Sequence, residues 1–247
     1  MGWLAAGSLI QLLVNLAVGL RLLALARRTR RLPETAFGLA LVLLGGIGYP
    51  LSIAARAGLA SSPEAAGQML AAGLFIQNVG CGALYVFLWR VFRPHDVWAL
   101  ALVALAGGVL AWSVPAEFLT DRFWGAIDGG PFYWSGLAAR AGTFAWATVE
   151  AGLYYTRMRR RLRLGLADPV VTDRFRLWAL TSASALFAFG VFATARLLGI
   201  DPPRSPLVMA TTSVAGLLAG ILLWLAFLPP RAYVERVARR GRHARSA

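Results

Sequence analysis

One carboxylate lies within a long apolar stretch of the sequence, where an ionisable group is costly to bury. Glu150 falls about two turns before the basic end of the segment Phe132–Tyr155. Carboxylates embedded in a membrane commonly form proton or cation sites, or anchor a polar ligand. The structural alternative is a carboxyl group that is protonated, or hydrogen-bonded to hydroxyls such as Thr181 or Ser184.

Small and polar residues recur around Glu150 at steps of three or four. They are Gly136, Arg140, Thr143, Ala147, Glu150 and Tyr154. On an α-helix this spacing places them on one face, which has to point into a helical bundle. We predict a ligand or proton site made of Glu150, Arg140, Thr143 and Tyr154, together with Asn15, Gln77 and Asn78 from earlier segments. Amides also hydrogen-bond between helices, so the last three residues have a structural alternative.

A second group of candidates lies toward the opposite ends of the apolar segments. Arg56 and Arg196 close two of these segments, and Trp134 opens another after the connection that contains Trp124. We predict that these four residues line an outer vestibule. The alternatives are arginines that extend to the headgroups and an aromatic belt at the membrane interface.

Several kinds of chemistry are excluded by residues that the sequence lacks. All 25 Lys+Arg residues are arginine, so no lysine is present to form a Schiff base with retinal. The two histidines, His95 and His243, lie outside the apolar segments, which leaves no histidine pair to bind zinc there. Cys81 is the single cysteine, and no serine-hydrolase, metalloprotease or phosphate-loop motif occurs. We predict a protein that is not an enzyme and that has no cofactor or metal site.

These candidates must be positioned by membrane helices, because the composition is too apolar for an ordinary soluble domain. Hydrophobic residues make up 58% of the 247 residues, charged residues only 15%, and the mean hydropathy is +0.63. A helix needs about 20 apolar residues to cross a bilayer. Seven segments approach this length: Trp3–Ala26, Thr35–Ala57, Gln68–Val91, Val97–Val114, Phe132–Tyr155, Leu177–Ile200 and Ser205–Phe227. We predict an all-α, polytopic bundle of seven transmembrane helices over residues 1–228, followed by a basic tail over 229–247.

The arginines predict the direction of this bundle. Most of them cluster in alternate connections and in the tail, for example in Arg27–Arg31 and Arg157–Arg163. Under the positive-inside rule these connections are cytoplasmic. The amino terminus is then outside and the carboxyl terminus in the cytoplasm, which fits a multi-pass protein of a bacterial cytoplasmic (inner) membrane.

Local signals predict where helices begin and bend. Ser62 and Ser205 each precede a proline, an arrangement typical of a helix amino terminus. Asp96 and Asp173 are candidate caps for the fourth and sixth segments. Pro50 lies inside the second segment after several glycines, so we expect a kink there.

The net charge of +14 predicts partners on the inner side. Since the arginines alternate with apolar segments, we expect contact with anionic lipids of the inner leaflet rather than with nucleic acid. Val234 and Val237 fall on one side of a possible short interfacial helix in the tail. Gly216 and Gly220 form a small-residue face in the seventh segment, suited to a homodimer or another membrane protein.

The seven-helix topology, with the exit sequence Leu228–Arg231, resembles the membrane sensor regions of bacterial histidine kinases. This resemblance implies a receptor-like sensor that binds a ligand or envelope signal from the outer side. Because no kinase domain follows in the sequence, such a sensor would signal through a cytoplasmic partner. The alternatives are a small-solute or proton-coupled transporter that uses Glu150, and an accessory subunit of a membrane complex.

Overall fold

The computed structural model describes residues 2–56, 58–120 and 130–243, which contain helices and no strand. The all-α prediction is therefore confirmed for this part of the chain. The α-helices are α1 (Gly2–Thr29), α2 (Leu32–Ala40), α3 (Tyr49–Arg56), α4 (Pro63–Phe92), α5 (Val97–Leu119), α6 (Pro131–Arg163), α7 (Pro169–Leu197), α8 (Pro206–Phe227) and α9 (Arg231–His243). A π-helical segment, Leu41–Gly48, joins α2 to α3, and a short 3₁₀ helix, Pro202–Arg204, precedes α8.

Six helical segments in the described residues are long and apolar enough to cross a membrane. They are Leu9–Thr29, Leu32–Arg56, Pro63–Phe92, Val97–Leu119, Pro169–Leu197 and Pro206–Phe227. Large apolar side chains on them point outward, for example Leu105, 69% exposed, and Val214, 56% exposed. Lipid rather than water is the solvent that suits such a surface. Helix α6 is long enough, at 33 residues, but carries Arg140, Glu150 and a basic end, and it is not among the six.

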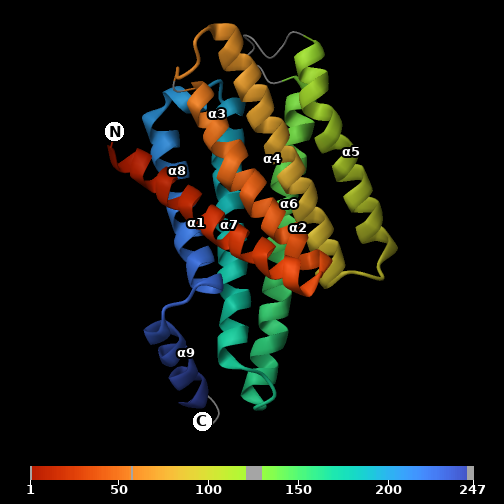
Figure 1. Cartoon of the computed structure of the whole chain (residues 1–247), viewed down its shortest axis with the longest axis vertical. Helices are drawn as coiled ribbons and strands as arrows, with labels where there is room; N and C mark the ends of the chain where they lie inside the picture. Colours follow the sequence, from red (N-terminus) through yellow and green to blue (C-terminus); the bar gives the residue numbers. More distant parts are fainter. Residues whose placement is uncertain (1, 57, 121–129, 244–247) are drawn as a thin grey trace.

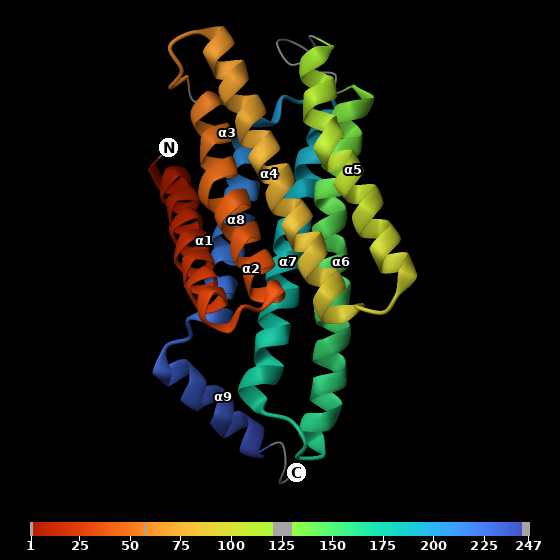
Figure 2. The same cartoon turned by 45° about the vertical axis from the view of Figure 1, so that its right-hand side comes forward.

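Helix α6 runs antiparallel between α5 and α7 and packs against both (Figure 1). Helices α1 and α8 pack together on the other side of α7, and α4 contacts α2, α5 and α6. The lower parts of α6 and α7 project beyond the neighbouring helices, and α9 lies beside this projection against α7 (Figure 2). The bundle therefore has one end that is extended by three helices.

Aromatic side chains fill the core where α2, α4, α7 and α8 meet. Phe37 stacks on Phe87 with ring centroids 4.7 Å apart, and Trp178 and Phe227 pack around Phe37 at 5.6 and 5.3 Å. Such rings contribute a large buried apolar area together with a specific geometry. This cluster holds the four helices in register.

The predicted helix starts are partly correct. Ser62 accepts a hydrogen bond from the Ala65 amide at 3.1 Å, and Ser205 accepts one from Val208 at 3.5 Å. Asp96 occupies the cap position of α5 but makes no capping hydrogen bond. The prediction for Asp173 was wrong, because α7 begins earlier, at Pro169, where Asp168 accepts from two backbone amides. The sequence analysis placed the helix start at the apolar boundary, whereas α7 continues past it.

The helix containing Pro50 is irregular before the proline, as its position suggests. Proline lacks an N–H and its ring crowds the carbonyl four residues earlier. The preceding turns are π-helical, and the Tyr49 amide donates to the Leu44 carbonyl, five residues back.

The end of α5 also differs from the prediction. The helix continues through Pro115 to Leu119, so it extends into the expected outer connection.

The small residues of α8 pack inside the bundle. A Cβ atom added at Gly216 would clash with Oε1 of Gln11 on α1, and one at Gly220 would lie 3.4 Å from the Gln11 Cα. The close approach predicted for this face is thus made with α1 of the same chain. Both glycines therefore contribute to the packing of α8 against α1.

Candidate functional site

Glu150 is buried and forms an ion pair at the lower end of α4. The Arg93 Nε donates to Glu150 Oε1 at 2.7 Å, and the indole Nε1 of Trp146 donates to the same oxygen at 3.2 Å. Arg93 also contacts Asp96 at 3.3 Å. The hydrogen bond to Glu150 is the main reason that the pKa of the Arg93 guanidinium lies above its ordinary value. Glu150 therefore carries a charge-assisted link between α4 and α6.

The partners suggested for Glu150 from the sequence were wrong. Thr181 Oγ1 donates to the Leu177 carbonyl and Ser184 Oγ to the Leu180 carbonyl, each at 2.9 Å within α7. Hydroxyls on a helix commonly bond the carbonyl four residues back in this way. They are therefore not used by the carboxylate.

A second polar centre, further up the bundle, is organised by Asn78. Its Nδ2 donates to the Leu110 carbonyl at 2.8 Å and to Ser113 Oγ at 3.1 Å, and its Oδ1 accepts from Arg140 Nη1 at 2.8 Å. One amide thus joins α4, α5 and α6. Asn78 is 2% exposed, so these hydrogen bonds replace those that water would make.

Arg140 carries a charge that the described carboxylates do not pair. It is 5% exposed, and it makes no ion pair with any acidic residue in the described part of the chain. Gly136, one turn earlier, packs closely against Ser113: a Cβ there would lie 2.7 Å from Ser113 Oγ and 3.8 Å from Arg140 Nη1. Glu117, near the end of α5, acts on Arg140 electrostatically without forming an ion pair. A buried guanidinium that makes no ion pair with the described carboxylates attracts negative charge.

The ends of α3, α6 and α7 bring further cationic groups close to Arg140. We call Arg56, Arg140, Arg196, Tyr133 and Glu117 the outer cluster. The Arg196 guanidinium lies 5.4 Å from the centroid of the Tyr133 ring, and the Tyr133 hydroxyl interacts electrostatically with all three arginines. That hydroxyl is buried and has no hydrogen-bond partner among the described residues. With three arginines and one glutamate, the outer cluster has an excess of positive charge.

Three of the remaining predicted site residues contact other parts of the bundle. Thr143 is buried and donates to the Ala139 carbonyl at 3.2 Å, whereas Tyr154 packs edge-on against Phe92 at 4.9 Å. Gln77 donates to the Gly48 carbonyl and to Ser52 Oγ, at 3.1 and 2.8 Å.

The predicted set is completed by Asn15, Trp134 and Trp124. Asn15 bonds the Gln11 carbonyl of its own helix and lies against Gly45. Trp134 packs edge-on against Tyr133, with ring centroids 5.4 Å apart, and Trp124 lies outside the described residues. The structure therefore divides part of the predicted set among the outer cluster, the Asn78 centre and the Glu150 ion pair. The others lie outside these three groups: Asn15, Gln77, Trp134, Thr143 and Tyr154.

Arg93, Tyr133 and Glu117 were not among the site residues predicted from the sequence. The one usable signal was depth, because Arg93 and Glu150 both lie near the inner ends of their segments. Depth alone does not reveal which helices are neighbours.

The described residues contain no group of His, Cys, Asp and Glu side chains suited to a metal ion. Comparisons with protein-family models, with characterised proteins and with solved structures find no match. The fold is that of a multi-pass α-helical membrane protein, judged by its apolar helices. Among the described residues, its polar interior includes one buried arginine, Arg140, and the buried amides of Asn15 and Asn78.

Proposed function

We propose that the chain is a receptor-like membrane sensor that binds a small anion at the outer cluster and signals through a cytoplasmic partner. The observation that carries the proposal is the buried Arg140, which makes no ion pair with a described carboxylate, beside the Tyr133 hydroxyl, which has no hydrogen-bond partner among the described residues. Guanidinium groups favour carboxylate and phosphate because they donate charge-assisted, often bidentate hydrogen bonds. A carboxylate or phosphate of modest size is thus the ligand class we infer.

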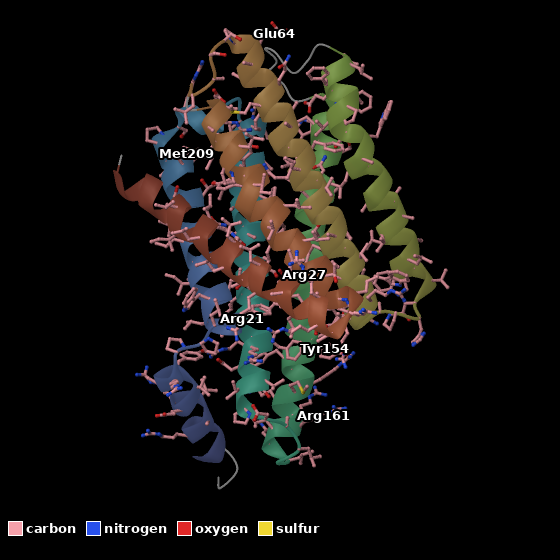
Figure 3. All side chains as sticks on the ribbon, in the orientation of Figure 1. Arg21, Arg27, Glu64, Tyr154, Arg161 and Met209 are labelled. Carbon is pink, nitrogen blue, oxygen red and sulfur yellow. The ribbon has the colours of Figure 1, made fainter. Side chains whose placement is uncertain are left out.

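The proposal includes a seventh span and a direction. Helix α6 connects the upper end of α5 to the lower start of α7, and its 33 residues extend roughly 50 Å. Glu64 and Arg161 lie at opposite ends of the bundle, and the arginine-rich end is the lower one (Figure 3). We infer that α6 crosses the membrane, that the lower end is cytoplasmic, and that the membrane is a bacterial inner membrane.

Transmission of the signal would follow α6, because one rigid element carries both polar centres. Arg140 and Glu150 are about 15 Å apart along the helix. An anion that draws Arg140 away from Asn78 would shift α6 against α4. That shift would strain the Arg93–Glu150 ion pair, and the projecting ends of α6 and α7 would pass the change to a partner.

A proton-coupled permease that uses Glu150 has less support. Its carboxylate is bonded to Arg93 and Trp146 rather than directed into a cavity. Ala147, which is fully buried and apolar, lies between Thr143 and Glu150 on the same face of α6. A continuous polar route from one side to the other is not formed by these residues.

Binding of sodium phosphate and sodium succinate to the purified protein in nanodiscs tests the ligand class. We expect Arg196→Gln to weaken binding of the preferred anion by at least about tenfold, since it removes a charge-assisted donor. Arg204→Gln is the matched control, because Arg204 lies at the same end and its side chain is 84% exposed. Equal affinities of both variants and the parent protein would contradict the outer site, as would a preference for neither anion over chloride.

Cysteine labelling tests the direction separately. Cys81 is fully buried, so it contributes little background reaction with a membrane-impermeant maleimide. We expect Glu64→Cys to react in intact cells and Arg161→Cys to react only after the membrane is opened. The reverse pattern would place the arginine-rich end outside.

A further inference from the structure

A groove lies at the other end of the molecule, between the projecting parts of α6, α7 and α9. Its volume is about 260 Å³. It is lined by Tyr155 and Arg159 of α6, by Asp173 and Arg176 of α7, and by Tyr233 and Arg236 of α9. Tyr154 and Arg161 mark the projecting part of α6 in Figure 3. We call this feature the inner groove.

The inner groove has more positive than negative charge, and its one acid is already engaged. Asp173 pairs with Arg176 at 2.7 Å and accepts from the Tyr233 hydroxyl at 2.5 Å. The other two lining arginines, Arg159 and Arg236, make no hydrogen bond or ion pair with described residues. Two guanidinium groups from different helices therefore line one cavity with their donors available.

The contact of Tyr233 with Asp173 determines that α9 contributes to the inner groove. It joins the helix that follows the last apolar segment to the first turns of α7. Burial, and next the hydrogen bond to Asp173, raise the pKa of the Tyr233 hydroxyl, so it remains a neutral donor at physiological pH. Arg236 is thereby held on the same side as Arg159.

The size and position of the inner groove limit its occupant. Sites for drug-sized ligands occupy about 300–1,000 Å³, so a cavity of 260 Å³ suits one small charged group better than a nucleotide. Asp173 and Arg176 immediately precede the apolar part of α7 that begins at Leu177. In the direction proposed above, this is the level of the inner-leaflet headgroups, where basic pockets between helices recognise lipid phosphates.

We propose that the inner groove binds a phosphate-bearing anion, held by Arg159 and Arg236 and supplied by a phospholipid headgroup of the inner leaflet. The site is distinct from the outer cluster and does not depend on an anion binding there. Its occupation would bridge α6 to α9 and hold the carboxyl-terminal helix against the projection. A free phosphate has the same chemistry, and the experiment below separates the two sources.

The test uses the full chain in neutral detergent, titrated calorimetrically with a short-chain phosphatidylglycerol, with inorganic phosphate and with the corresponding phosphatidylcholine. We expect phosphatidylglycerol to bind most tightly. The variant Arg159→Gln/Arg236→Gln should bind it at least about tenfold more weakly, because two charge-assisted donors are lost. The control Arg160→Gln/Arg239→Gln removes the same charge from α6 and α9 outside the groove, and we expect a change below about twofold.

Each outcome has a defined consequence. Inorganic phosphate that binds as tightly as phosphatidylglycerol, with the same loss in the groove variant, supports the phosphate site but identifies a soluble anion. Equal losses in the two double variants indicate general charge attraction and overturn the proposal. It is also overturned if neither anion binds more tightly than phosphatidylcholine. The unfolding temperatures of the two double variants should match, so that a difference in affinity between them reports binding rather than loss of fold.

Discussion

The Arg93–Glu150 ion pair yields the sharpest test of the bundle, because its two halves differ in exposure. The Glu150 side chain is 3% exposed and that of Arg93 is 30% exposed. Arg93→Gln leaves a buried carboxylate without its cation, whereas Glu150→Gln leaves a guanidinium that can turn toward the interface. The two single substitutions should therefore have unequal costs.

The magnitudes follow from this difference. Removing one partner of a fully buried pair costs about 3–5 kcal/mol, and the partial exposure of Arg93 reduces this to about 2–3 kcal/mol for Arg93→Gln. Glu150→Gln should cost about 1 kcal/mol, since the amide oxygen still accepts from Trp146. The double variant leaves no buried charge, so we expect it to be more stable than Arg93→Gln alone by about 1 kcal/mol.

Reversible unfolding in mixed micelles, followed by tryptophan fluorescence, measures these free energies. Arg90→Gln is the matched control, because Arg90 is exposed on the same helix and lies over the Trp89 ring at 4.6 Å. The reasoning is refuted if Arg93→Gln and Arg90→Gln have equal costs. It is also refuted if the double variant is as unstable as the sum of the single variants, because the two side chains would then be independent.

Three further predictions concern packing, the buried amide and α9. Gly80→Ala should destabilise the bundle by about 1–3 kcal/mol in the same unfolding assay, because the added Cβ would lie 2.8 Å from the Leu44 backbone nitrogen. Gly82→Ala is the control: its added Cβ would have no neighbouring atom within 4 Å, so we expect no measurable loss of stability. Asn78→Ala should lower the free energy of unfolding by about 2–4 kcal/mol and accelerate amide exchange in α5, because Arg140 loses its acceptor. A loss below about 1 kcal/mol would contradict the role of Asn78 in joining α4, α5 and α6. The pKa of Tyr233 is raised in the folded chain, so its stabilising contribution is complete below the ordinary tyrosine pKa and is lost as the pH rises through the folded value. Limited proteolysis should therefore release α9 in alkaline buffer, and Tyr233→Phe should abolish that pH dependence.

Helix content and six of the apolar segments could be predicted from the sequence because the relevant signal is local. A backbone in lipid must satisfy its own hydrogen bonds, so a long apolar stretch specifies a helix whatever its neighbours are. The inward face of α6 was also predictable, since Arg140, Thr143 and Glu150 share one face by spacing alone. All three are buried in the structure.

Helix ends were less predictable, because hydropathy follows the membrane rather than the helix. The apolar boundary at Leu177 lies eight residues after the start of α7 at Pro169. For this reason Asp173 was taken for a cap. Its carboxylate instead bonds Tyr233, which is 60 residues away in the chain.

The sequence by itself determined the helical class, the apolar segments and the asymmetry of arginine between the two ends. It also determined that Glu150 and Arg140 lie on one buried face. Only the tertiary structure decided their partners: Arg93 is 57 residues from Glu150, and Asn78 is 62 residues from Arg140. The reason is physical, because spacing along one helix fixes which residues share a face, while the packing of helices against each other decides which faces meet.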